Sequence, residues 1–171
     1  GFSITELNPE SDGLILEEKL VNALRDDTFL ISIMLANNEI GVIQPIERIF
    51  KICQKNNIKF HTDAAQCLGY LPIKNFDSLA NMITLSSHKI YGPKGIGLLI
   101  IDEDIQLSPL LYGGGQEFGY RSGTIPLPLI VGFSKAIELA IKNQERNSIQ
   151  LSNLRDTLIN GLLKNNSKIL I

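Results

Sequence analysis

The stretch that decides the fold is Met82-Ile83-Thr84-Leu85-Ser86-Ser87-His88-Lys89, and Ile90-Tyr91-Gly92-Pro93-Lys94-Gly95-Ile96-Gly97 follows it directly. Its first four residues are mostly apolar and predict a short buried strand. Two hydroxyls, an imidazole and an amine come together where this strand ends, and the glycines and the proline hold the backbone in a tight course. An amine that is partly unprotonated can form a Schiff base, and its polar neighbours can bind an anion. The stretch therefore predicts reactive chemistry at a strand end.

Outward from this stretch, strand-like and helix-like patterns alternate along the chain, which predicts a layered α/β domain. The nearly continuous apolar run 29–36 is typical of a strand that is covered on both faces. Pro45 suits the first turn of a helix whose inner stripe is Ile46, Ile49, Phe50 and Cys53. The remaining expected strands are 58–62, 82–85 and 98–101. The remaining expected helices are 16–25, a brief segment 64–68, 128–142 and 148–163. A hinge or subdomain boundary is expected at 143–147, and a glycine-rich ordered loop at 112–124.

Composition excludes several classes of protein. The chain has 171 residues, of which 44% are hydrophobic and 20% charged, with a formal net charge of −2. This balance is typical of a globular domain with a core, and it favours neither disorder nor binding to nucleic acid. The sequence contains no bilayer-length apolar run and no secretion signal, so we expect a cytoplasmic protein without a membrane partner. Cys53 and Cys67 lack metal-site spacing and are interpreted as reduced thiols.

Polar side chains follow three of the expected strands. Asn37-Asn38-Glu39 follows the first strand, Asp63 with Gln66 follows the second, and residues 86–89 follow the third. In parallel α/β sheets, ligands bind beyond the carboxyl ends of the strands. If these strands are parallel neighbours, an acid, an amine, amides and anion-binding groups meet in one crevice.

This set of groups suits pyridoxal phosphate. That cofactor needs a lysine for its aldehyde, a carboxylate facing its pyridinium nitrogen, and donors around its phosphate. Lys89 is the predicted Schiff-base lysine and Asp63 the predicted pyridinium partner, although Asp63 also suits a helix N-cap. Dinucleotide and nucleotide sites are disfavoured, because the chain has neither GxGxxG after a first strand nor GxxxxGK[ST]. The predicted hydrogen-bonding groups are Ser86, Ser87 and His88 around the phosphate and Schiff base, and Gln66 and Asn38 at the phenolic oxygen.

Four motifs, in order, resemble the class V aminotransferase family, and specifically its cysteine desulfurases of iron–sulfur cluster assembly. The resemblance covers nearly the whole chain. The motifs are Asn37-Asn38-Glu39-Ile40-Gly41, His61-Thr62-Asp63-Ala64-Ala65-Gln66, residues 86–97, and Gly113-Gly114-Gly115-Gln116-Glu117 leading to Arg121-Ser122-Gly123-Thr124.

The resemblance implies a fold-type I enzyme that depends on pyridoxal phosphate, with a mostly parallel sheet, working as a homodimer. It implies that residues 1–143 are part of the cofactor-binding large domain and that 144–171 form a linking helix and the start of a small domain. The implied reaction converts L-cysteine to L-alanine and passes a persulfide sulfur to an acceptor or iron–sulfur scaffold protein. Lys89 would be both the Schiff-base lysine and the proton carrier, and Thr124 would reach the phosphate of the neighbouring subunit's cofactor. Asn38, Gln66, Ser86 and His88 would contact the cofactor.

The chain also departs from the family pattern. A ring-stacking histidine and a phosphate-binding Gly-Thr pair belong upstream, and the sulfur-accepting cysteine and a carboxylate-binding arginine belong downstream. Together with the start at Gly1, these departures predict a central fragment of a longer enzyme, whose own activity stays open. Neither Cys53 nor Cys67 matches the sulfur-accepting cysteine. The alternatives are a selenocysteine lyase or another class V aminotransferase, or an inactive truncated remnant.

Overall fold

A single four-stranded sheet organises the chain in the computed structural model, which describes residues 1–73, 79–166 and 169. The strands lie in chain order, and the first three run parallel, whereas the last is antiparallel to its neighbour. This mostly parallel sheet confirms the expected α/β class. The strands are β1 (Leu30–Ser32), β2 (Lys59–Asp63), β3 (Met82–Ser86) and β4 (Gly97–Ile101).

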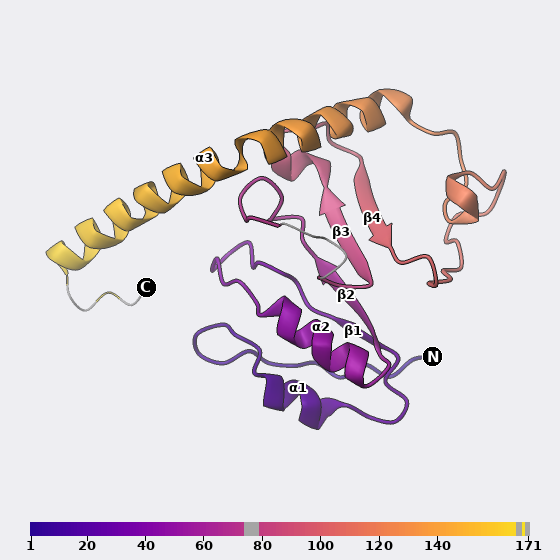
Figure 1. The fold of residues 1–171 in the computed structure, drawn as a ribbon, viewed down its shortest axis with the longest axis horizontal. Coiled ribbons are helices and arrows are strands. Elements are labelled where there is room, and N and C mark those ends of the chain that lie inside the picture. The colour runs from indigo at the N-terminus through magenta and orange to yellow at the C-terminus, as the bar shows by residue number, and fades with distance from the viewer. Residues whose placement is uncertain (74–78, 167–168, 170–171) are drawn as a thin grey trace.

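The helices lie at opposite ends of the molecule (Figure 1). Two shorter helices pack near the N-terminal part of the chain, and a long helix crosses the far end of the sheet and extends well beyond it. Two 3-10 turns interrupt the loops that flank β4. The helical elements are α1 (Glu17–Ala23), α2 (Ile46–Lys55), η2 (Ser87–Ile90), η3 (Glu117–Gly119) and α3 (Leu127–Asn165).

The core forms between α2 and the sheet, as the sequence predicts. All four residues of the predicted inner stripe, Ile46, Ile49, Phe50 and Cys53, are buried. Burial alternates along β2, so that Phe60 and Thr62 face this core. The ring of Phe60 stacks on that of Phe50 with centroids 6.1 Å apart. The opposite face of β2, which carries Lys59, His61 and Asp63, is therefore left for polar chemistry.

Residues 64–68 form a turn, so the expected brief helix is wrong. The Asp63 carboxylate accepts the amide of Ala65 at 2.8 Å, and the amide of Ala64 donates to the carbonyl of Thr84 at 2.9 Å. These bonds direct the first amides of the segment away from a helical ladder. The expected strand 29–36 is also shorter, although Ile33 and Leu35 still donate backbone bonds to β2.

One continuous helix of 39 residues replaces the two expected helices, so the expected break in the helix at 143–147 is wrong. Polar side chains in that stretch are satisfied without breaking the helix. Asn143 Nδ2 donates to the carbonyl of Leu139 at 2.8 Å, and Gln144 Nε2 donates to that of Tyr70 at 3.3 Å. Because the stretch contains neither glycine nor proline, its backbone has no reason to leave the helix.

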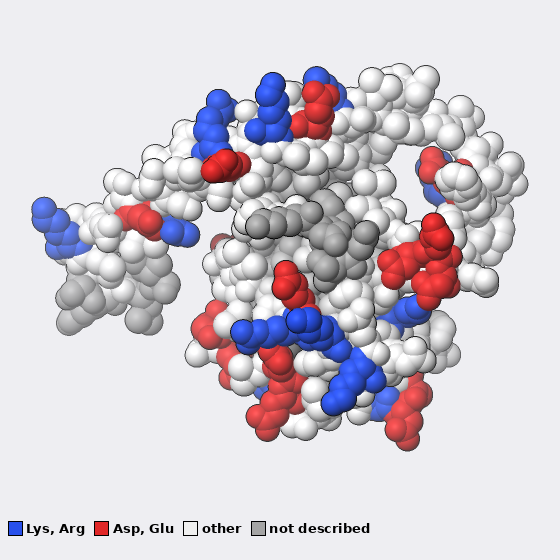
Figure 2. All heavy atoms as spheres, in the orientation of Figure 1, with Lys and Arg blue, Asp and Glu red and all other residues white. Residues whose placement is uncertain are grey.

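The surface carries charges of both signs. Over α3, lysine and arginine side chains are interspersed with acidic ones, and the same mixture covers the region of α1 and α2 on the face that Figure 2 shows. Within the described residues, no helix combines the length and the apolar character that crossing a membrane requires.

Candidate active site

Asp63 closes β2 and is held from both sides by backbone hydrogen bonds. Its carbonyl accepts the amide of Leu35 at 2.8 Å, and its register partner on β3 is Thr84. The Asp63 side chain is partly buried and accepts the Ala65 amide at 2.8 Å, an Asx turn that orients the carboxylate. Asp63 is therefore a well-positioned anion at the carboxyl end of a central strand.

Lys89 follows β3, the strand that pairs with the strand of Asp63, and lies in the short turn just beyond its end. The 3-10 turn η2 carries it, and the side chain is partly buried. Ser86, the last residue of β3, hydrogen-bonds through Oγ to Nδ1 of His88 at 2.9 Å. The turn ends at Tyr91, whose φ of 64° is left-handed. The parallel register of β2 and β3 thus places the end of β2, which carries Asp63, beside residues 87–92, which contain Lys89 and form the lysine turn. The order of the motifs predicts this arrangement.

The lysine turn is packed tightly against α3. Ser87 is fully buried, and its hydroxyl has no hydrogen-bond partner among the described residues. A Cβ placed on Gly92 would lie 2.2 Å from Ser87 Oγ and 3.0 Å from the Cβ of Ala136 on α3. Only glycine fits there, so the backbone after Lys89 can approach both the turn and the helix.

The other predicted cofactor contacts lie on loops. Asn37 shapes the turn after β1, because its Oδ1 accepts the amides of Glu39 and Ile40 at 2.9 and 3.0 Å, and this leaves Asn38 exposed. Gln66 is partly buried in the turn after Asp63. Thr124 is exposed on the loop that leads to α3, and no hydrogen bond among the described residues joins it to Asp63 or Lys89. The roles of all three stay predictions.

The sequence prediction left out His61, which the structure places in a network across three strands. Its Nδ1 lies 2.8 Å from Ser32 Oγ on β1, and its Nε2 lies 2.9 Å from Thr84 Oγ1 on β3. Burial lowers the pKa of His61, and the charge of Asp63 opposes this in part. The spacing of two residues between His61 and Asp63 on a strand was the signal that could have found it, since it puts both on one face.

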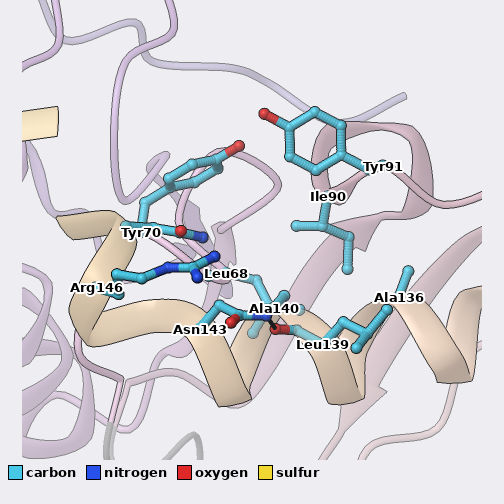
Figure 3. A pocket seen from close by; sticks show the side chains of 11 residues that line it. Leu68, Tyr70, Ile90, Tyr91, Ala136, Leu139, Ala140, Asn143 and Arg146 are labelled. Carbon is cyan, nitrogen blue, oxygen red and sulfur yellow. Dashed lines mark hydrogen bonds between the residues drawn. The ribbon is translucent and has the colours of Figure 1, made fainter. Parts of the chain in front are cut away.

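A cavity of about 290 Å³ lies between α3, the turn at 68–70 and the end of η2 (Figure 3). In Figure 3 the side chains of Tyr70 and Tyr91 lie on the same side of α3 and point toward one another, and Arg146 extends from α3 beside Tyr70. Burial raises the pKa of Tyr70, and the neighbouring Tyr91 raises it further to a smaller extent. None of the predicted cofactor contacts lines this cavity, although Ile90, the residue after Lys89, does.

Both cysteines are buried in the core and unsuited to nucleophilic work. Burial raises the pKa of the Cys53 thiol to about 11. Burial and, to a smaller extent, the charge of Asp63 raise the pKa of the Cys67 thiol to about 12. Because the thiolate is the reactive form, neither side chain is suited to accept sulfur.

Comparison with known sequences identifies close relatives of the chain. It is 47% identical over 165 residues to a mitochondrial cysteine desulfurase of Eremothecium gossypii, and the match covers 95% of this chain and 34% of that protein. It is 48% identical over 164 residues to the cysteine desulfurase IscS of Histophilus somni, with 95% of this chain and 41% of that protein covered. The chain therefore spans well under half the length of these relatives.

Solved structures share its fold. A NifS-like protein superposes with a TM-score of 0.91 at 38% identity, over 96% of this chain and 46% of that one. A structure described as SspA in complex with cysteine gives a TM-score of 0.77 at 48% identity, over 81% of this chain and 40% of that one. The sequence profile of the class-V aminotransferases matches residues 1–169. With this match and the relatives at nearly half identity, the chain belongs to the class-V aminotransferase family.

Proposed function

We propose that this chain is the cofactor-binding part of a cysteine desulfurase that uses pyridoxal phosphate. The overall reaction is L-cysteine plus an acceptor thiol giving L-alanine plus the acceptor persulfide, so that one sulfur atom moves and no external oxidant is needed. The observation that carries the proposal is the adjacency of two strand ends, where β2 ends on Asp63 and β3 leads into the turn with Lys89. Relatives named cysteine desulfurases support the choice of substrate.

The residues at the strand ends fit this cofactor. When bound, pyridoxal phosphate withdraws electrons from the carbon next to the substrate amine. Lys89 would hold it by condensing its amine with the aldehyde, with loss of one water. The anchored Asp63 carboxylate would face the protonated ring nitrogen, and Ser86 with its partner His88 would supply hydrogen bonds. The amine of Lys89 would also take up and return a proton at the substrate.

The remaining assignments extend this proposal beyond the strand ends. Residues 1–143 would belong to the large domain, and 144–171 would link to a small second domain, since the apolar side chains of the outer half of α3 are exposed and free to pack there. The enzyme would work as a homodimer, with Thr124 reaching the partner's cofactor phosphate, and pass sulfur to an acceptor or iron–sulfur scaffold protein. Because Cys53 and Cys67 are buried, the accepting thiol would be another one. Two free cysteines support a reducing compartment such as the cytoplasm.

Covalent trapping tests the proposal. The full chain is mixed with pyridoxal phosphate and reduced with borohydride, and the modified lysine is located by peptide mass mapping. We expect the label at Lys89 and its loss in Lys89→Ala. Lys94→Ala is the matched control, because Lys94 is an exposed lysine of the same loop and its removal should leave the label in place. A label spread over surface lysines, or located at another lysine, would contradict the proposal.

A further inference from the structure

The His61 network joins three parallel strands through side chains on one face of the sheet. Ser32, His61 and Thr84 come from β1, β2 and β3, and the strand register makes Ser32 the partner of His61. Both ring nitrogens of His61 are therefore engaged by hydroxyl groups. Because a hydroxyl can donate or accept, the imidazole can be satisfied while neutral, as one nitrogen donates and the other accepts.

The same face carries Asp63, two residues further along β2 and directly beside Thr84 in the register. The network thus ends next to Asp63, the carboxylate that the proposed function pairs with the ring nitrogen of pyridoxal phosphate. Among the described residues, two charged groups flank His61 on β2, Lys59 and Asp63. Lys59, two residues before it on β2, is paired with Asp104 at 2.5 Å. Asp63 is the charge that acts on the imidazole, and β1 and β3 contribute only hydroxyls to it.

We propose that His61 is a positioning residue for Asp63, whose neutral imidazole ties β1 and β3 to β2 and leaves the Asp63 carboxylate unpaired for the cofactor's ring nitrogen. This inference rests on the proposed function, because it takes Asp63 as the partner of that nitrogen. His61, which does not contact the reacting atoms, thereby determines how strongly the Asp63 carboxylate binds the ring nitrogen.

The charge state of His61 is central to this role. A protonated imidazole on the same face would attract the Asp63 carboxylate and compete with a cationic ring for it. Burial works against protonation here, because it lowers the pKa of His61 more than the charge of Asp63 raises it. The hydroxyl partners also hold the ring in place, so that the imidazole does not turn toward the carboxylate.

Nuclear magnetic resonance can test the network without any cofactor. The chain has only two histidines, so the ring nitrogens of a ¹⁵N-labelled sample give two sets of signals, and His88→Asn identifies which belong to His61. We expect His61 to be neutral at pH 7, in one tautomer, and to titrate below the value of about 6.5 of an unperturbed histidine. Titration at or above that value, or rapid averaging of tautomers, would overturn the proposal.

Cofactor binding then tests the action on Asp63. Thr84→Val keeps the shape of the side chain but removes the hydroxyl that contacts Nε2. We expect it to raise the dissociation constant of pyridoxal phosphate about 3- to 10-fold, the usual effect of losing one hydrogen bond. The effect should vanish for the 1-deaza analogue, in which C–H replaces the ring nitrogen. Thr157→Val is the matched control, since it makes the same change on the exposed part of α3 and should alter neither dissociation constant.

The outcomes separate the two proposals. Equal weakening of both ligands by Thr84→Val would mean that the network acts only on the fold, and no weakening would mean that it does not act on Asp63, so either result overturns the inference. Asp63→Asn should itself weaken pyridoxal phosphate but not the analogue. If the wild-type chain fails to bind pyridoxal phosphate, or if Asp63→Asn weakens pyridoxal phosphate and the 1-deaza analogue equally, the proposed function is wrong and so is the inference. Both of these results are obtained without the Thr84→Val variant.

Discussion

Replacing Gly92 by alanine should destabilise the lysine turn through one contact that can be removed separately. The new Cβ would lie 2.2 Å from Ser87 Oγ, whereas its next contacts, Ala136 Cβ and the Ser87 carbonyl, are at 3.0 and 3.1 Å. The first distance is far inside van der Waals contact, and the other two require shifts of a few tenths of an ångström. The hydroxyl is therefore the main obstacle.

The magnitudes follow from these contacts. Overpacking of this kind costs about 1–3 kcal/mol in the free energy of unfolding, and we expect about 2 for Gly92→Ala. Ser87→Ala alone should stabilise the fold by about 1 kcal/mol, because it removes a buried hydroxyl without a partner. In the double variant the nearest clash is gone. The double variant should therefore be about 1–2 kcal/mol more stable than the sum of the two single changes predicts.

Urea unfolding followed by circular dichroism measures this cycle on wild type, both single variants and the double variant. The slopes should agree, so that differences in midpoint report stability. Borohydride labelling of Lys89 on the same samples tells whether the turn keeps its shape. Additivity of the two changes within about 0.5 kcal/mol, or a destabilising Ser87→Ala, would refute the reasoning about the orphan hydroxyl.

Two further predictions concern the core and the turn after Asp63. Burial raises the pKa of Cys53 to about 11 and that of Cys67 to about 12, so the folded chain holds both protons where the unfolded chain releases them. The free energy of unfolding should therefore fall as pH rises from about 8.5. A Cys53→Ala/Cys67→Ala variant should be less stable at pH 7 but should lose less of its unfolding free energy over the same pH range. Parallel curves of unfolding free energy against pH for wild type and variant would contradict this. Gly69→Ala should cost about 2–4 kcal/mol by thermal or urea unfolding, because the position has φ +82° and its Cβ would lie 2.9 Å from Ala140 Cβ. Gly95→Ala, at φ +89° with open space around it, should cost only about 1–2 kcal/mol, and equal costs would show that the contact with α3 is unimportant.

Sequence patterns predicted those parts of the fold that depend on local periodicity. The stripe of α2 is visible because Ile46, Ile49, Phe50 and Cys53 repeat at helical spacing, and all four are buried. The direction of β4 was not visible, because an apolar run reads the same whether the strand is parallel or antiparallel. The unbroken α3 was missed because Asn143 and Asn147 are typical of helix ends, yet Asn143 bonds within its own helix.

The candidate site was predictable in its residue types more than in its arrangement. Motif order placed Asp63 and Lys89 after successive strands, and the parallel register of those strands is present. The sequence pattern alone could not decide which of Asn37 and Asn38 shapes the turn after β1. The hydrogen bonds of the Asn37 side chain identify it as the turn residue. For His61 the sequence left an ordinary strand residue and a hydrogen-bonding residue behind the site equally open, because its partners come from strands 29 and 23 residues away in the chain.

The antiparallel pairing of β3 and β4 has a consequence for how the chain folds. Ser86 and Gly97 are register partners, so the loop that carries Lys89 is closed at both ends by one hairpin-like ladder. Hairpins form in about 1–10 μs, since their loops are short and cost little entropy to close. The pairing of β1 with β2 must wait for a crossover through α2 that joins Leu30 to Lys59. The ladder that closes this loop is thus made of contacts close in sequence, whereas its packing against Ala136 of α3 joins residues far apart in the chain and is expected to form later.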